Sequence, residues 1–308
     1  MIAENQSSPG DFFIVGFSDL PVLDVALFVS FLLIYLMTLL GNLLVMATIY
    51  SNLRLHTPMY FFLSNLSFVD ICYTSVIFPE MLAHFFLEGT HISLTECLLQ
   101  MYFFLVMLST EFLLLTVMAY DRYVAICNPL RYLTIMNKAV CIRLAVGSWV
   151  GSYLVPLTHT LLISRLPFCE SHTIDHFFCD FVSLMQLSCT STSTLETLSY
   201  ALGTIVAVMS FLSIILSYVN IASSILKIRS KEGRSKAFST CASHLTVVIL
   251  FYVSVCSAYM RPMSTYSMIN NKILSLSYIA VTPLCNPVIY SLKNKDFKSA
   301  LIKTIRNK

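Results

Sequence analysis

The stretch MAYDRYVAICNPLRY, residues 118–132, overlaps the end of a long apolar run, MYFFLVMLSTEFLLLTVMAY, residues 101–120. Such a run is typical of a helix that crosses a lipid bilayer, which needs about 20 predominantly apolar residues. It is followed at once by an acid and a base, Asp121 and Arg122. Because an arginine in lipid must find a partner or water, the pair predicts that the helix reaches a polar layer there.

The composition of the whole chain extends this interpretation. Of 308 residues, 57% are hydrophobic and 11% are charged, against roughly 45–50% and 25% in soluble domains. A soluble fold of this length would need more charge to cover its surface, and so large an apolar surface would aggregate. The composition therefore predicts a membrane protein.

Seven stretches are long and apolar enough to cross the bilayer. We expect an all-α, polytopic membrane protein whose seven-helix bundle forms a single domain over residues 1–308. The expected spans are 25–53, 57–79, 97–120, 144–164, 198–226, 237–260 and 273–292, between an N-terminal segment, 1–24, and a C-terminal tail, 293–308.

Basic residues predict the orientation. All but three of the 19 Lys and Arg residues fall in the segments on one side of the predicted bundle, and the exceptions are Arg165, Arg261 and Lys272. Short cytoplasmic loops carry the excess of Lys and Arg, so we expect an extracellular N-terminus and a cytoplasmic C-terminus. In that external segment, Asn5 opens an Asn-Gln-Ser acceptor for glycosylation.

The ten cysteines separate by compartment once this topology is drawn. Four fall on the oxidising outer side, where disulfides form; they are Cys97, Cys169, Cys179 and Cys189. Four cysteines allow three pairings, and the spacing does not choose among them. His172 and His176 lie close to Cys179, so a copper or zinc site is an alternative if that thiol is not in a disulfide.

The Asp-Arg pair has two interpretations. Arg122 can pair with Asp121 and with the hydroxyl of Tyr218 on the fifth span, which gives a two-state element that a ligand elsewhere could bias. Alternatively, Arg122 is an interfacial arginine that extends to the lipid headgroups.

Five stretches together resemble olfactory (odorant) receptors, which are rhodopsin-like, class A G-protein-coupled receptors. They are GN (41–42), LHTPMYFFLSNLSFVD (55–70), MAYDRYVAIC (118–127), KAFSTCASHL (236–245) and PLCNPVIYSLKN (283–294), in the order found in that family. The resemblance covers nearly the whole chain. It implies a multi-pass receptor of the plasma membrane, not an enzyme, that binds volatile odorants and activates a stimulatory, olfactory-type heterotrimeric G protein to raise cyclic AMP.

The resemblance also assigns roles to particular residues. Those implied at the G-protein face are Asp121, Arg122, Tyr123, Tyr218, Asn286, Pro287 and Tyr290, the last three matching the family's Asn-Pro-x-x-Tyr. The proline kinks its helix because it removes one backbone hydrogen bond. With this family we expect the disulfides Cys97–Cys179 and Cys169–Cys189.

Asp70 and Glu111 are the carboxylates that fall in mid-span, and we expect them at similar depth. Buried ionisable groups in a membrane are candidates for function. Two neighbouring carboxylates either share a proton or hold a cation. The resemblance to receptors with a central sodium site favours Na⁺, with Ser109 or Asn286 as neutral oxygen donors; a protonated structural pair is the alternative.

An odorant needs an enclosed apolar cavity with one or two polar groups, and we expect it in the outer halves of spans three, five, six and seven. Ordinary helix packing is the alternative for each apolar member of the set, and Ser109 and Tyr259 are the expected polar contacts. With no acid or base there, neutral esters, ketones, alcohols or aldehydes fit better than amines. The expected residues are Phe104, Leu105, Leu108, Ser109, Phe112, Leu202, Gly203, Val206, Tyr252, Val255, Cys256, Tyr259, Leu276 and Ile279.

On the inner side, the basic segment 227–236 suits anionic lipid or an acidic protein surface. The tail carries Phe297, Leu301, Ile302 and Ile305 at near-helical spacing, which predicts a short amphipathic helix at the membrane surface. Nothing indicates a nucleic-acid partner. A proton-coupled transporter using Asp70 and Glu111 is the main rival, but the chain has no internal duplication. A channel would need polar rings, and an enzyme a nucleophile with its base, and neither pattern is present in the spans.

Overall fold

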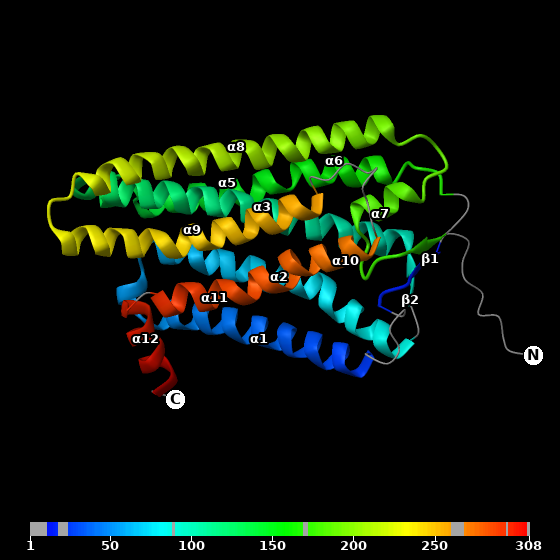
Figure 1. The fold of residues 1–308 in the computed structure, drawn as a ribbon, viewed down its shortest axis with the longest axis horizontal. Coiled ribbons are helices and arrows are strands. Elements are labelled where there is room, and N and C mark those ends of the chain that lie inside the picture. Colours follow the sequence, from blue (N-terminus) through cyan, green and yellow to red (C-terminus); the bar gives the residue numbers. More distant parts are fainter. Residues whose placement is uncertain are drawn as a thin grey trace, which may run out of the picture.

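The computed structural model describes residues 11–17, 24–87, 90–168, 172–259, 268–293 and 295–306. Long helices run side by side and form one bundle (Figure 1), and within these residues seven are long and apolar enough to cross a membrane. The predicted seven-helix fold is confirmed. The spanning elements are α1 (Asp24–Ser51), α2 (Pro58–Leu87), α3 (Leu94–Cys127), α5 with α6 (Lys138–Ser152 and Leu154–Ile163), α8 (Ser193–Leu226), α9 (Lys231–Tyr259) and α10 to α11 (Met268–Leu276 and Thr282–Lys293).

Several helices extend beyond the apolar spans expected for them. Hydropathy marks only the residues inside the hydrocarbon, whereas a polar turn outside it stays helical when its end is capped. Helix α3 begins three residues before its predicted span, where Ser93 and Glu96 form a capping box. The Ser93 hydroxyl accepts from the Glu96 backbone at 3.3 Å, and the Ser93 backbone donates to the Glu96 carboxylate at 3.1 Å.

A proline explains the break in helix four, and a second proline leaves one carbonyl of helix seven without its helical donor. Pro156 has no N–H to donate to the carbonyl of Ser152, and α5 ends there before α6 begins. In helix seven a π-helical turn, η4 (Ser277–Val281), joins α10 to α11. Pro287 likewise leaves the carbonyl of Pro283 without its helical donor, and the side chain of Asn42 on α1 donates to that carbonyl at 3.1 Å.

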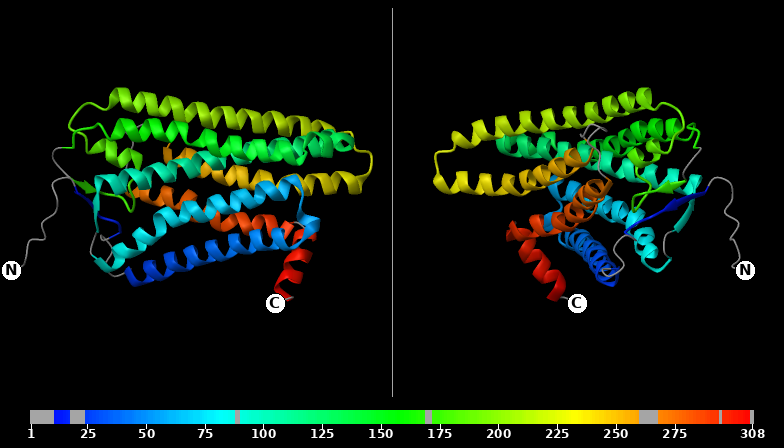
Figure 2. Two further views of the ribbon diagram at one scale, coloured as in Figure 1. Left: turned by 180° about the vertical axis from the view of Figure 1, so that it is seen from behind. Right: turned by 45° about the vertical axis from the view of Figure 1, so that its right-hand side comes forward.

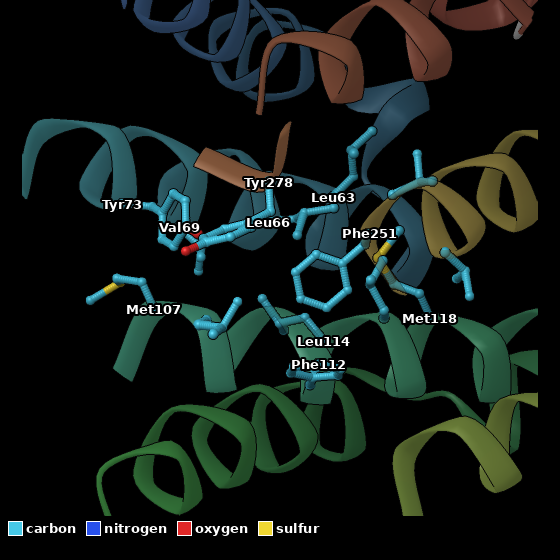
Figure 3. Close-up of a cluster of buried hydrophobic side chains, with 14 of the residues drawn as sticks. Leu63, Leu66, Val69, Tyr73, Met107, Phe112, Leu114, Met118, Phe251 and Tyr278 are labelled. Carbon is cyan, nitrogen blue, oxygen red and sulfur yellow. The ribbon is translucent and has the colours of Figure 1, made fainter. Parts of the chain in front are cut away.

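The centre of the bundle is a continuous apolar core between α2, α3 and α9. Figure 3 shows α2 and α3 side chains facing one another, with Phe251 from α9 and Tyr278 from η4 between them. The side chains labelled on α2 and α3 are Leu63, Leu66, Val69, Tyr73, Met107, Phe112, Leu114 and Met118. This packing holds the helices that carry the candidate sites.

A small sheet, which the sequence did not predict, caps one end of the bundle. Strand β1 (Asp11–Ile14) pairs antiparallel with β2 (Thr90–Ser93) and parallel with β3 (Thr173–Ile174). Lys272 at the start of helix seven donates to the carbonyl of Gly16 at 2.9 Å and forms an ion pair with Asp175. These contacts tie the N-terminal strand and the loop before α8 to the bundle.

Short elements complete both ends. The sheet and helix α7 (Phe181–Gln186) lie at one end, and helix α12 (Lys295–Arg306) at the other, where it turns away from the bundle axis (Figure 2). Between the long helices lie η1 (Leu53–Leu55), η2 (Pro129–Arg131) and α4 (Tyr132–Ile135). Phe297 of α12 is fully buried and stacks on Tyr60. The predicted tail helix is therefore present, and its apolar side packs on the bundle.

Candidate functional site

A cavity of about 150 Å³ lies between α3, α6, α7, α8 and α9, towards the end of the bundle that carries the sheet. Nine of its wall residues belong to the expected set: Leu105, Leu108, Ser109, Phe112, Gly203, Val206, Val255, Cys256 and Tyr259. Both expected polar contacts, Ser109 and Tyr259, are among them. The remaining wall residues are Val155, Pro156, His159, Phe181, Val182, Ser199, Tyr200, Thr204 and Ala207.

Five expected residues lie outside this wall: Phe104, Leu202, Tyr252, Leu276 and Ile279. Phe104 packs against the rings of Tyr73 and Phe178 instead. Tyr252 lies behind the wall, where its ring contacts Phe112 and Phe211. No described residue of helix seven lines this cavity, so the expected ligand contacts at Leu276 and Ile279 stay predictions that the cavity does not support.

The residues that the sequence interpretation missed come mainly from α6, α7 and α8. His159, in an apolar span, was the one visible signal that helix four contributes. Helix α7 gave no signal, because it lies in a loop whose position depends on the Cys97–Cys179 disulfide. That predicted bridge is confirmed, and it brings Phe181 and Val182 over the cavity.

Asp180 links this loop to the spanning helices. Its carboxylate caps α7 by accepting from the Val182 backbone at 3.1 Å, and it also accepts from the hydroxyl of Tyr259 on α9 at 3.0 Å. The Tyr259 hydroxyl lies 2.9 Å from that of Tyr278. Burial raises the pKa of Asp180 above its ordinary value, partly offset by these hydrogen bonds. Tyr259 thus contacts both the cavity and its cover.

The described residues of the loop between α6 and α8 do not form the copper or zinc site given as an alternative. Cys179 is in a disulfide and has no thiolate to offer, and no group of three or more His, Cys, Asp and Glu within the described residues could hold a metal ion. His176 is buried, and burial together with the charge of Lys272 lowers its pKa to about 3. Cys189 is also disulfide-bonded. Cys169 and the glycosylation acceptor Asn5 lie outside the described residues.

The two mid-span carboxylates come together in the core, as expected. Asp70 and Glu111 are both buried and interact electrostatically. The amide of Asn286 donates to Asp70 at 3.0 and 3.2 Å, whereas neither Glu111 oxygen nor the Asn286 carbonyl oxygen has a hydrogen-bond partner. These orphan oxygens fit either a sodium ion or a shared proton. Ser109, the other expected donor, lines the cavity instead.

At the opposite end, the Asp-Arg pair differs from the expectation. Asp121 is buried and accepts from the Tyr132 hydroxyl at 2.7 Å, and the described residues contain no ion pair between Asp121 and Arg122. Neighbouring residues on a helix point in different directions, which explains the separation. Arg122 is half-buried, and its Nε has no hydrogen-bond partner.

The expected hydroxyl partner of Arg122 is also engaged elsewhere. The Tyr218 hydroxyl lies 2.8 Å from Nδ1 of His244, whose Nε2 is 3.1 Å from the carbonyl of Leu115. Tyr290 is buried, and its hydroxyl has no hydrogen-bond partner. His244 therefore joins helices three, five and six in this conformation, a role that the sequence interpretation did not assign to it.

A seven-helix membrane bundle, with an apolar cavity at one end and an Asp-Arg-Tyr triplet at the other, defines a receptor of the G-protein-coupled class. The family model for olfactory receptors matches residues 31–308. The chain is 50% identical to human olfactory receptor 1L4 over 96% of both chains, and 48% identical to gorilla olfactory receptor 1G1 over 99% of this chain and 97% of that one. Human olfactory receptor 5A1 is 48% identical, over 99% and 97%. The chain belongs to the olfactory receptor family, whose members are G-protein-coupled receptors for odorants and not enzymes.

Proposed function

We propose that this receptor binds small, neutral, mostly apolar volatile molecules in the cavity between α3, α6, α7, α8 and α9. We propose further that it activates a stimulatory, olfactory-type G protein and raises cyclic AMP. The receptor would lie in the plasma membrane with its N-terminus extracellular. The cavity is the observation that carries the proposal.

The character of the cavity wall supports a neutral ligand. None of the described wall residues is Asp, Glu, Lys or Arg, so a charged amine would be buried without a partner, at a large cost in free energy. The wall is mainly aliphatic and aromatic, with hydroxyls from Ser109, Thr204 and Tyr259 among it. A volume of about 150 Å³ suits a small organic molecule.

The opposite face supports G-protein coupling. The Nε of Arg122 has no hydrogen-bond partner in this conformation, which supports a role for this donor in binding a partner. The segment 227–236, which joins α8 to α9 at the same end of the bundle (Figure 1), carries five basic residues and one acid. A positive surface there suits both anionic headgroups and an acidic patch on a partner, and it supports a cytoplasmic position by the positive-inside rule.

Cyclic AMP measured in cells that co-express a stimulatory olfactory-type G protein tests the proposal. The cells are challenged with mixtures of volatile esters, ketones, alcohols and aldehydes, and surface expression is measured in parallel. Arg122→Ala is expected to abolish the response while leaving surface expression intact. Val206→Trp, which fills the cavity, is expected to reduce the response at least tenfold. Ile205→Trp is its matched control, because Ile205 lies on the outer side of α8.

Two results would refute the proposal. One is a response that survives both Arg122→Ala and Val206→Trp. The other is no response to any mixture from a receptor that is present at the cell surface with its G protein.

A further inference from the structure

Two adjacent residues of the cavity wall, both on α8, are exposed on the outside of the bundle. Gly203 and Thr204 line the cavity, and both are also exposed on the outside of the bundle. Their neighbours Ile205 and Met209 are exposed as well, at 58% and 61%. Exposed apolar side chains on a spanning helix face lipid. Gly203 and Thr204, which we call the α8 window, therefore lie where the cavity meets the hydrocarbon. Helix α8 is at the edge of the bundle (Figure 1).

The absence of a side chain at Gly203 keeps this place open. A Cβ atom built on Gly203 would meet no heavy atom within 4 Å. Glycine costs about 1 kcal/mol relative to alanine inside a helix, and no close backbone approach at this position requires it. Apart from Gly203 and Thr204, the described wall residues are buried or half-buried, so the missing side chain leaves the wall thinnest at this position.

The outer end of the cavity, by contrast, is covered. Phe178, Cys179 and Asp180 are each at most 1% exposed, and Val182 of α7 is 5% exposed. The Cys97–Cys179 disulfide and the hydrogen bond from Tyr259 to Asp180 hold this cover in place. A molecule arriving from the water must displace the cover, whereas one dissolved in the bilayer need only pass Gly203.

We propose that the α8 window is a lateral portal through which small apolar molecules reach the cavity from the bilayer. The proposal rests on the proposed function only in taking the cavity as the ligand site. Partition into lipid concentrates such molecules, by about fourfold for each added methylene group. The portal would thus favour apolar ligands kinetically, before any contact inside the cavity discriminates among them.

Cys256 allows the route to be tested without knowing an odorant. Its free thiol is part of the cavity wall, on α9. The purified full-length receptor in lipid nanodiscs is exposed to benzyl methanethiosulfonate, which is apolar, or to its permanently charged trimethylammonium-ethyl analogue, which stays in water. Modification of the peptide that contains Cys256 is followed by mass spectrometry, which separates it from the other free cysteines.

Gly203→Leu is the test variant, because the added side chain meets no atom near its Cβ and narrows the window. Gly147→Leu is the matched control. Gly147 is also an exposed glycine of a spanning helix with no heavy atom near its Cβ, but it does not line the cavity. Thermal stability of each variant shows whether it is folded.

We expect the apolar reagent to modify Cys256 at least tenfold faster than the charged one. Gly203→Leu should slow the apolar reagent by about tenfold, the effect of a passage barrier raised by about 1.4 kcal/mol, and Gly147→Leu should not. Equal rates for both reagents would overturn the portal, and so would no modification by the apolar reagent. Equal slowing of both reagents by Gly203→Leu would also overturn it, because the leucine would then be shielding Cys256 from within. Since none of these outcomes involves cyclic AMP, failure of the portal is distinguishable from failure of the proposed function.

Discussion

Replacing His176 by glutamine is expected to reduce the loss of thermal stability that the receptor undergoes as the pH falls. His176 is 1% exposed and packs against the rings of Phe177 and Phe178. It also feels the charge of the Lys272 ammonium, which is itself paired with Asp175. Burial first and the charge of Lys272 second lower the pKa of His176 from 6.5 to about 3. The imidazole is therefore neutral in the folded receptor and protonates more readily in the unfolded chain.

The sign and size of the effect follow from proton linkage. Because the folded pKa is depressed, the contribution of His176 is fully present above pH 6.5 and is lost as the pH falls towards 3. At pH 4.5 the two pKa values give a loss of about 2.7 kcal/mol in the free energy of unfolding. A loss of that size lowers the melting temperature by about 5 °C in a protein of this length.

Thermal unfolding of the receptor in nanodiscs between pH 7 and pH 4.5 measures this loss. His176→Gln cannot titrate, so its melting temperature should fall by about 5 °C less than that of the native receptor over this range. His172→Gln, four residues earlier in the same loop, retains His176 and should retain the full loss. Parallel curves for the native receptor and His176→Gln would refute the burial argument.

Three further predictions concern the helix packing at Gly41, the Asp121 end of the bundle and the disulfide. Gly41→Ala places a Cβ 3.1 Å from a proline of α11 and should lower the free energy of unfolding by about 1 kcal/mol or more. Gly147→Ala meets no atom within 4 Å and should raise it by up to about 1 kcal/mol. Equal melting temperatures for the two variants would contradict the contact at Gly41. Tyr132→Phe removes the hydroxyl that donates to Asp121 at 2.7 Å, a hydrogen bond to a charged group worth about 1.5–3 kcal/mol. If this bond restrains the inactive conformation, the variant should raise cyclic AMP without odorant by about tenfold. Basal cyclic AMP equal to that of the native receptor would contradict this role. Cys97→Ser opens a disulfide loop with a sequence separation of 82 residues and should lower the free energy of unfolding by about 4 kcal/mol. Flow cytometry should then find little receptor at the cell surface, and normal amounts would show that the bridge is dispensable.

The agreement between sequence and structure is closest where a single physical requirement acts on a whole segment. Each span must satisfy its backbone hydrogen bonds inside lipid, and helices do this locally, so hydropathy was sufficient to locate seven of them. It did not locate their ends, because the capping box at Ser93 and the polar first turn of α9 lie beyond the hydrocarbon. The cap sheet was missed since its strands are only two to four residues long and pair across distant segments.

The candidate site was predictable only in part, and the reason is geometric. Helical spacing indicates which residues of α3 share a face, and Leu105, Leu108, Ser109 and Phe112 do line the cavity. Spacing does not say which neighbouring helix that face meets. The structure places α6 and α7 there beside the expected α8 and α9, and not helix seven, so Leu276 and Ile279 were expected in a wall that they do not line.

By itself, the sequence determined that this protein is a seven-helix membrane receptor of the olfactory family, because span hydropathy and the five motif stretches are properties of contiguous residues. Only the tertiary structure decided that Tyr132 and not Arg122 partners Asp121, that a loop helix covers the cavity, and that Gly203 lies between cavity and lipid. Each of these depends on the rotation of a helix about its axis and on which helix lies beside it. The rotation and the neighbours of each helix arise from packing across the whole bundle, so they cannot be predicted from any short run of residues.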